Sequence, residues 1–199
     1  DQDLLGDYTG AAVIFGATGG VMEAALRTVA DILEEKDLKD FEYTAVRGVE
    51  EGIKEATVNM GGMDVKVAIA HGTANAAKLL DMIKAGEATG YHFIEVMGCS
   101  GGCVTGGGQP QVPAKKLVDV DVRVERAKAL YEEDELMDKR KSHENPQIQQ
   151  LYKDFLGKPN GHLAHKLLHT HYYAREKYPV QNNDSANPLN EAAVAKESR

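Results

Sequence analysis

The segment FIEVMGCSGGCVTGGGQP, residues 93–110, joins a short apolar run to a loop rich in glycine. Its first five residues, Phe93–Met97, are predicted to form a β-strand. The only two cysteines of the chain, Cys99 and Cys103, follow directly. A strand that opens into a glycine-rich turn is typical of α/β sheets, in which the loops after parallel strands bind ligands.

The rest of the chain alternates between predicted strands and helices. The predicted strands are Ala11–Phe15, Phe41–Arg47, Ile53–Asn59, Met63–Ala70 and Phe93–Met97. The predicted helices run from Val21 to Leu33, from Thr73 to Ile83, over Val124–Met137, from Pro146 to Gly157 and over Leu163–Arg175. Three predicted strands end in the turns Gly16–Gly20, His71–Thr73 and Gly98–Gly108. If those strands are parallel, we expect the turns to meet at one edge of the sheet.

Composition excludes several classes of protein. The chain has 199 residues, of which 42% are hydrophobic, enough for one sizeable core. A net charge of −8 argues against a nucleic-acid partner. The apolar runs are far shorter than the roughly 20 residues of a membrane span. Because no secretory signal is visible, we expect a cytoplasmic location. The first residue is Asp1 rather than Met, as in a piece of a longer protein.

The spacing of the two cysteines favours metal binding over a disulfide. A bond between Cys99 and Cys103 would close a loop of only three residues. Thiolates hold iron–sulfur clusters, and the small residues Gly101 and Gly102 would let backbone N–H groups approach such a cluster. The spacing alone also fits a flexible loop with two unrelated thiols, because a cluster normally has four ligands.

Longer patterns add a resemblance to a known family. Residues 95–110 match E-x-M-x-C-x-x-G-C-x-x-G-G-G-Q-P, and so resemble the third H-cluster signature of diiron (FeFe-type) hydrogenases at every fixed position. The segment IFGATGGVMEAALR, residues 14–27, looks like part of the same catalytic domain. Arg140–Pro146, Leu151-Tyr152 and His165–Tyr172 are similar to the family's small-subunit-type C-terminal segment. The resemblance covers about residues 4–178.

This resemblance implies an α/β fold. It implies one lobe of the hydrogenase catalytic domain over residues 1–120, with a mixed, largely parallel sheet flanked by helices. A helical, small-subunit-like extension is expected over residues 121–178. Residues 179–199 are polar and are expected to form a disordered tail.

The resemblance also implies roles for five residues. Cys99 resembles a ligand of the four-iron cubane of the H-cluster, and Cys103 the ligand that bridges the cubane to the organometallic diiron subsite. Met97 resembles a pocket residue beside that subsite. Phe15 and Gly16 resemble wall residues of the same pocket. The reaction implied is the reversible conversion of two protons and two electrons into dihydrogen, as in a ferredoxin-type FeFe hydrogenase.

The two earlier signatures of the family, of the T-S-C-C-P and M-P-C-x-x-K types, do not occur in this chain. They supply the other two cubane ligands, so this chain holds two of the four. We expect the missing N-terminal lobe to lie in the same polypeptide or, less in keeping with the family, on a separate chain. A redox partner such as ferredoxin or NAD(P)H-linked subunits is also expected.

Three alternatives remain open at the level of the whole chain. One is a sensory relative that keeps the cluster but signals. Another is a Narf-like iron–sulfur assembly protein, which shares the cysteine framework but not the activity. The third is a folded lobe that binds no cluster by itself.

Smaller patterns have alternatives of their own. His162, His165 and His169 share one helical face near His171, which suggests either a metal site or, as we favour, a packing helix. Gly16–Gly20 also resembles a phosphate-binding turn, although it lacks the Lys-Ser/Thr of a P-loop.

Two further positions and one charged run are predicted to be structural. Glu23 lies in the first turn of its helix, where an acid favours the helix dipole, so a proton relay is the weaker hypothesis. His71 at a strand end is expected to be a hydrogen-bonded structural residue. The acidic run Glu132–Glu135 is expected to be a solvated helix face.

Overall fold

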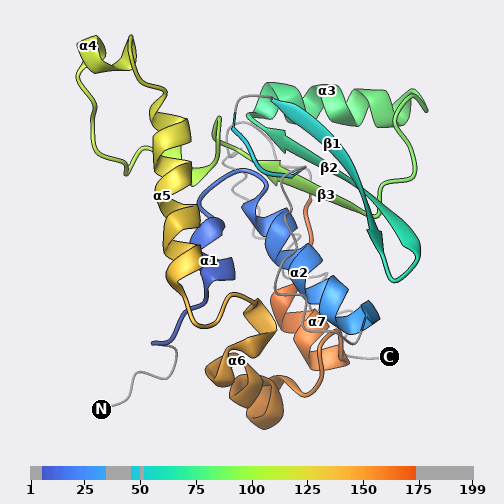
Figure 1. Ribbon diagram of the computed structural model, residues 1–199. Coiled ribbons are helices and arrows are strands. Elements are labelled where there is room, and N and C mark those ends of the chain that lie inside the picture. Colours follow the sequence, from blue (N-terminus) through green and yellow to red (C-terminus); the bar gives the residue numbers. More distant parts are fainter. Residues whose placement is uncertain (1–5, 35–45, 50–51, 174–199) are drawn as a thin grey trace, which may run out of the picture. The chain divides into compact units, whose positions relative to one another are not determined.

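The computed structural model describes residues 6–34, 46–49 and 52–173 (Figure 1). The chain divides into two units, residues 1–157 and 158–199. The predicted strand Phe41–Arg47 and the predicted tail 179–199 lie largely or wholly outside the described residues. Within the described part of the chain, no helix is both long and apolar enough to cross a membrane.

The first unit is built on a three-stranded mixed sheet in the order β1-β2-β3. β1 (Ile53–Met60) pairs antiparallel with β2 (Met63–His71) through the predicted glycine turn, with Ile53 opposite Ala70. β3 (Phe93–Met97) runs parallel to β2, so that His71 lies opposite Met97. The predicted hairpin, the strand before the cysteines and the mixed α/β class are all confirmed.

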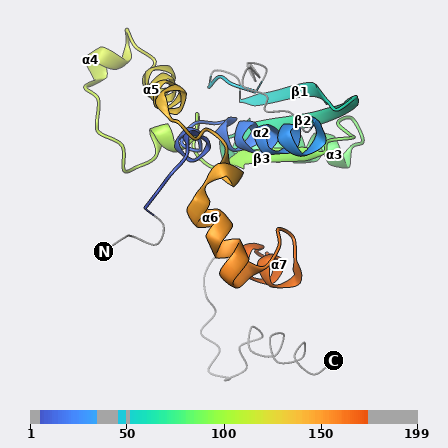
Figure 2. The same cartoon turned by 60° about the horizontal axis from the view of Figure 1, so that its bottom comes forward.

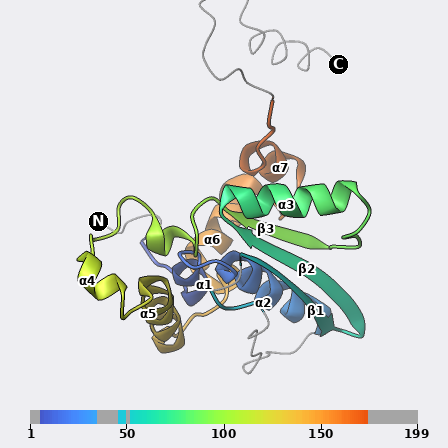
Figure 3. The ribbon, with the colours of Figure 1, turned by 90° about the horizontal axis from the view of Figure 1, so that it is seen from above.

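Helices cover both faces of this sheet (Figure 3). α2 (Gly20–Glu34) packs Met22, Leu26 and Ala30 against alternate residues of β1 and β2, including Val67 and Ile69. On the other face, Leu79 of α3 (Thr73–Lys84) packs with Ala68 and Ala70 of β2. Because successive residues of a strand point to opposite faces, β2 is buried on both sides.

The predicted strand Ala11–Phe15 is wrong: the segment forms the short helix α1 (Gly10–Ile14). Periodicity cannot separate a strand from a helix over five apolar residues. Here two N–H groups of the first turn, those of Gly10 and Ala11, donate to the carbonyls of Lys139 and Arg140. These distant acceptors satisfy donors that a short helix leaves free.

Four further α-helices lie in the described part of the chain. They are α4 (Ala114–Leu117), α5 (Val122–Leu136), α6 (Pro146–Leu151) and, in the second unit, α7 (His162–Leu168). α5 packs beside α1 (Figures 1 and 2). The predicted cap of α6 is confirmed, since the Asn145 side chain accepts from the N–H groups of Gln147 and Ile148. A π-helical turn, Tyr152–Leu156, extends α6 to the predicted stop at Gly157.

The helix predicted to end at Arg175 ends at Leu168 instead, and residues 169–173 are not helical. Ala164 is its one buried residue. A helix this short owes its stability to packing, and one buried residue provides too little apolar burial to stabilise further turns.

Candidate metal centre

Both cysteines lie on one loop at the carboxyl end of β3, and both are free and exposed. The loop turns back after Cys99, whose carbonyl accepts from the N–H of Gly102 at 3.1 Å. Cys103 then opens a 3₁₀ turn that ends at Thr105. The two thiols are therefore presented by a short, internally hydrogen-bonded segment.

Two further turns meet this loop, as the sequence predicted. The N–H of Thr18 donates to the carbonyl of Gly101 at 3.0 Å, and the N–H of Val104 donates to the carbonyl of Gly16 at 3.0 Å. From the turn His71–Thr73, the N–H of Gly72 donates to the carbonyl of Met97 at 2.8 Å. The turn Gly16–Gly20 follows a helix rather than a strand, yet both turns lie beside the cysteine loop.

Gly102 is where the first turn and the cysteine loop touch. Its φ is +100°, and an added Cβ would lie 2.7 Å from both the Gly16 oxygen and the Thr18 nitrogen. A side chain is excluded by both the backbone angle and the space. At Gly107 and Gly108, in contrast, an added Cβ would meet no atom of the described residues within 4 Å. The loop is therefore tightly packed at Gly102 and open at Gly107 and Gly108.

His71 holds the cysteine loop through a hydrogen bond to its backbone. It is buried, and its Nδ1 accepts from the N–H of Gly101 at 2.9 Å. An accepting Nδ1 carries no proton, so the neutral ring holds its proton on Nε2. The expectation of a hydrogen-bonded structural histidine is confirmed.

Glu95 is the residue that the sequence reasoning missed. Its buried carboxylate accepts from the N–H groups of Gly19 and Met22, both at 2.6 Å, and so caps α2. Burial raises the pKa of Glu95, and the backbone hydrogen bonds only partly offset this. A charged residue inside the apolar strand FIEVM was the available signal. Because Glu95 already occupies these two N–H groups, a phosphate at this turn would have to displace it.

The remaining predicted pocket residues lie around the same loop. Gly16 contacts it through the carbonyl described above, and Phe15, immediately before, is 43% exposed. Met97 ends β3 two residues before Cys99 and is partly buried. The structure thus brings the turn containing Phe15 and Gly16 to the loop that carries the thiols.

A buried ion-pair cluster corrects one expectation and extends another. Glu23 lies in the first turn of α2, as predicted, and it is also fully buried and pairs with Arg27 at 2.6 Å and Arg47 at 2.8 Å. Asp134 is not solvated with the rest of its acidic run, since it is also fully buried. It accepts from Arg27 and from Arg140, each at 2.7 Å. Arg27 and Asp134 lie 107 positions apart in the sequence, so no local pattern could reveal their pairing, whereas Glu23 and Arg27 form a local i,i+4 pair.

Comparisons with known proteins identify the family. Residues 1–107 match the family model described as iron only hydrogenase large subunit, C-terminal domain. The chain belongs to the iron-only hydrogenases. Residues 120–175 match a second model, iron hydrogenase small subunit. The family resemblance drawn from the sequence is confirmed.

Individual hydrogenases are also similar to this chain. Iron hydrogenase 1 of Clostridium pasteurianum is 49% identical over 168 residues, which cover 84% of this chain and 29% of that protein. The NADP-reducing hydrogenase subunit HndD of Solidesulfovibrio fructosivorans is 48% identical over 180 residues, 89% of this chain and 30% of that subunit. The chain therefore spans under a third of the length of these relatives.

A solved FeFe-hydrogenase from Chlamydomonas reinhardtii superposes with a TM-score of 0.62 at 39% identity, covering 86% of this chain and 48% of that one. Cytosolic iron-sulfur assembly component 3 of Rattus norvegicus is also similar, at a lower 31% identity over 163 residues. The superposition on the solved hydrogenase confirms the predicted fold class.

The donor set fits half of the group that this family carries. Cys99 and Cys103 offer two exposed thiols, the ligand type that iron–sulfur clusters require, beside an open stretch of glycine backbone. No third metal-ligating side chain joins them among the described residues. The residues present fit two ligand positions of a four-ligand cluster.

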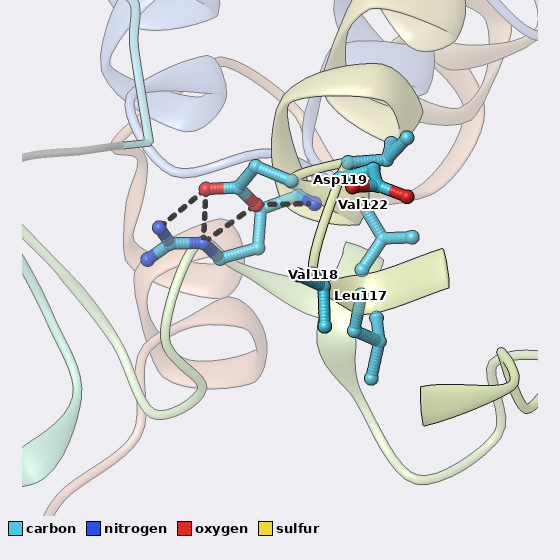
Figure 4. Close-up of a pocket in the computed structure, with 7 residues that line it drawn as sticks. Leu117, Val118, Asp119 and Val122 are labelled. Atoms are coloured by element: carbon cyan, nitrogen blue, oxygen red, sulfur yellow. Dashed lines mark hydrogen bonds and ion pairs between the residues drawn. The ribbon is translucent and has the colours of Figure 1, made fainter. Parts of the chain in front are cut away.

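Two other features of this iron-only hydrogenase chain are not built as sites. His162, His165 and His169 are exposed, and the rings of the latter two lie 4.1 Å apart. Within the described ranges, no three potential ligands gather there to hold a metal. A shallow hollow between α4 and α5 is lined mostly by aliphatic residues such as Leu117 and Val118 (Figure 4).

Proposed function

We propose that this chain supplies two of the four cysteine ligands of an H-cluster in a reversible hydrogenase. The observation that carries the proposal is the pair of free, exposed thiols, Cys99 and Cys103, on one hydrogen-bonded loop. Cys99 would bind the cubane, and Cys103 would bridge it to the diiron subsite. The other two ligands would come from the part of the catalytic domain that precedes this chain in its longer relatives.

When bound, the H-cluster supplies the iron chemistry that interconverts protons, electrons and dihydrogen. The protein's part is to place and enclose it. Cys99 and Cys103 would hold it as thiolates, and Gly101 and Gly102 would allow main-chain N–H groups to approach its sulfurs. Met97 would wall the pocket with a soft, apolar side chain.

The turn across the loop would contribute the opposite wall. Phe15 is large and 43% exposed, so it offers apolar surface that a second lobe or the cluster could cover. Gly16 adjoins it, and the absence of a side chain there leaves room for Leu130 of α5, 2.7 Å from the position of an added Cβ. Burial behind these residues would exclude water from the metal.

A hydrogenase is favoured over an iron–sulfur assembly protein by the higher identity to the hydrogenases, 49% against 31%. A sensory relative would share every residue discussed here. The electron partner, ferredoxin or an NAD(P)H-linked subunit, belongs to the proposal too. The NADP-reducing relative supports the second option.

The test compares the chain alone with the chain joined to the preceding part of the domain. We expect iron analysis and EPR to find no stable cubane in the chain alone and a stoichiometric one in the joined protein. Maturation of the joined protein should then give hydrogen evolution, which Cys103→Ala abolishes. A stoichiometric cluster in the chain alone, or its absence from the joined protein, would refute the two-plus-two division of ligands.

A further inference from the structure

Arg126 of α5 binds the part of the cysteine loop that follows Cys103. Nη1 of Arg126 donates to the carbonyl of Val104 at 2.8 Å, and Nη2 donates to the carbonyl of Pro110 at 2.7 Å. A guanidinium presents such donors as a rigid planar fork, which a lysine cannot reproduce. The two carbonyls border the segment that follows Cys103.

The segment between those carbonyls has little else to hold its shape. It contains Gly106, Gly107 and Gly108, which lose more backbone entropy on ordering than other residues do. Its other hydrogen bonds are local. The N–H groups of Thr105, Gly106 and Gln109 donate to the carbonyls of Gly102 at 3.2 Å, Cys103 at 2.9 Å and Gly106 at 3.0 Å, and the Thr105 hydroxyl donates to the Ser100 carbonyl at 2.5 Å. The fork of Arg126 therefore provides a tie between this segment and another element of the fold.

The helix that carries the fork is itself firmly placed. Ala127 is buried in a cluster with Ala17, against which Leu130 also packs. Near the other end of α5, Asp134 is fixed by Arg27 at 2.7 Å. The fork thus projects from a helix that is anchored to the same turn that meets the cysteines.

α5 belongs to residues 120–175, the part that matches the small-subunit model, whereas Cys103 and Val104 lie near the end of the large-subunit match, which stops at residue 107. We propose that Arg126 is a positioning residue for the metal site, through which the small-subunit-type part orders the loop that follows Cys103. The consequence for the cluster rests on the proposed function. The ordering of the loop does not.

The first test is hydrogen–deuterium exchange of a peptide covering residues 105–111 in the chain without metal. Arg126→Met keeps the aliphatic stem and removes both donors, and Lys128→Met makes a similar change two residues away on the same helix. We expect exchange to quicken by about tenfold or more in Arg126→Met, because two hydrogen bonds from a charged donor are lost. Lys128→Met should match the wild type, because the Lys128 side chain is 66% exposed.

Arg126→Lys separates charge from geometry. It keeps the positive charge and loses the planar fork, so its exchange should also be faster than that of the wild type. Exchange at the wild-type rate in either Arg126 variant, with circular dichroism unchanged, would overturn the inference.

The second test uses the joined protein loaded with iron. Arg126→Met is expected to retain its iron but to broaden the EPR signal of the cubane, because the loop beside one ligand is less ordered. An unchanged EPR signal would overturn the link to the cluster. Failure of even the wild type to load would refute the proposed function instead, and the exchange result would stand by itself.

Discussion

Asp134→Asn should destabilise this chain strongly, although it lies far from the cysteines in sequence. The Asp134 carboxylate is fully buried and accepts three hydrogen bonds: from Nη1 of Arg27 at 2.8 Å, from Nη2 of Arg27 at 2.7 Å and from Arg140 at 2.7 Å. The asparagine keeps the shape but loses the charge, and its amide group turns donors toward donors.

The size of the effect follows from what is left behind. Removing one partner of a buried ion pair costs about 3–5 kcal/mol, since the other charge stays buried. Arg27, whose side chain is 7% exposed, keeps its bond to Glu23 at 2.6 Å, which places the expected loss of unfolding free energy near the lower end, about 3 kcal/mol. Glu135→Gln, an exposed change next to Asp134, should stay within about 0.5 kcal/mol.

Equilibrium urea unfolding at pH 7, followed by circular dichroism, measures the difference. With a urea m-value of about 1–3 kcal/mol/M, a loss of about 3 kcal/mol lowers the midpoint by at least about 1 M. A midpoint for Asp134→Asn as high as that for Glu135→Gln would refute the reasoning, because the buried charge of Arg27 would then not depend on the charge of Asp134.

The same variant predicts a pH dependence. Burial alone would raise the pKa of Asp134, but hydrogen bonds from Arg27 and Arg140 outweigh it and lower the pKa below its ordinary value of 3.8. Such a carboxylate adds stability that is complete above the unfolded pKa and is lost as the pH falls through the folded pKa. The difference between wild type and Asp134→Asn should therefore be constant down to about pH 5 and shrink below about pH 4.

Three other substitutions, and Gly107→Ala as a control, probe the site directly. Gly102→Ala should cost about 3 kcal/mol or more, because φ is +100° and the new methyl would press on two backbone atoms, whereas Gly107→Ala should change thermal stability little. Glu95→Gln should cost about 1–3 kcal/mol at pH 7, because its amide must turn a donor toward one of the two N–H groups that the Glu95 carboxylate caps at the start of α2. Thr18→Val should be neutral or stabilise by about 1 kcal/mol, since the buried Thr18 hydroxyl has no hydrogen-bond partner among the described residues.

Each of these has an outcome that would contradict it. Equal melting temperatures for Gly102→Ala and Gly107→Ala would remove the close approach at Gly102. For Glu95, burial raises the pKa, so its contribution to stability falls as the pH rises through the folded value; Glu95→Gln should abolish that fall. A clear loss of stability in Thr18→Val would mean that the hydroxyl has a partner in solution.

The sequence by itself determined what depends on neighbours along the chain. The hairpin, the cap at Asn145 and the strand before Cys99 were all predicted, because turns, caps and alternation are local properties. The cysteine spacing and the family signature were likewise readable, since Cys99 and Cys103 share one loop.

Only the tertiary structure decided the features that join distant segments. Gly10–Ile14 is helical partly because two of its N–H groups donate to backbone carbonyls near residue 140. Asp134 is buried because Arg27 pairs with it. Glu95 became visible as the cap of α2, and Arg126 as a support of the cysteine loop, for the same reason. A hydrogen bond or an ion pair is set by distance in space, and residues separated by a hundred positions leave no periodic trace of one.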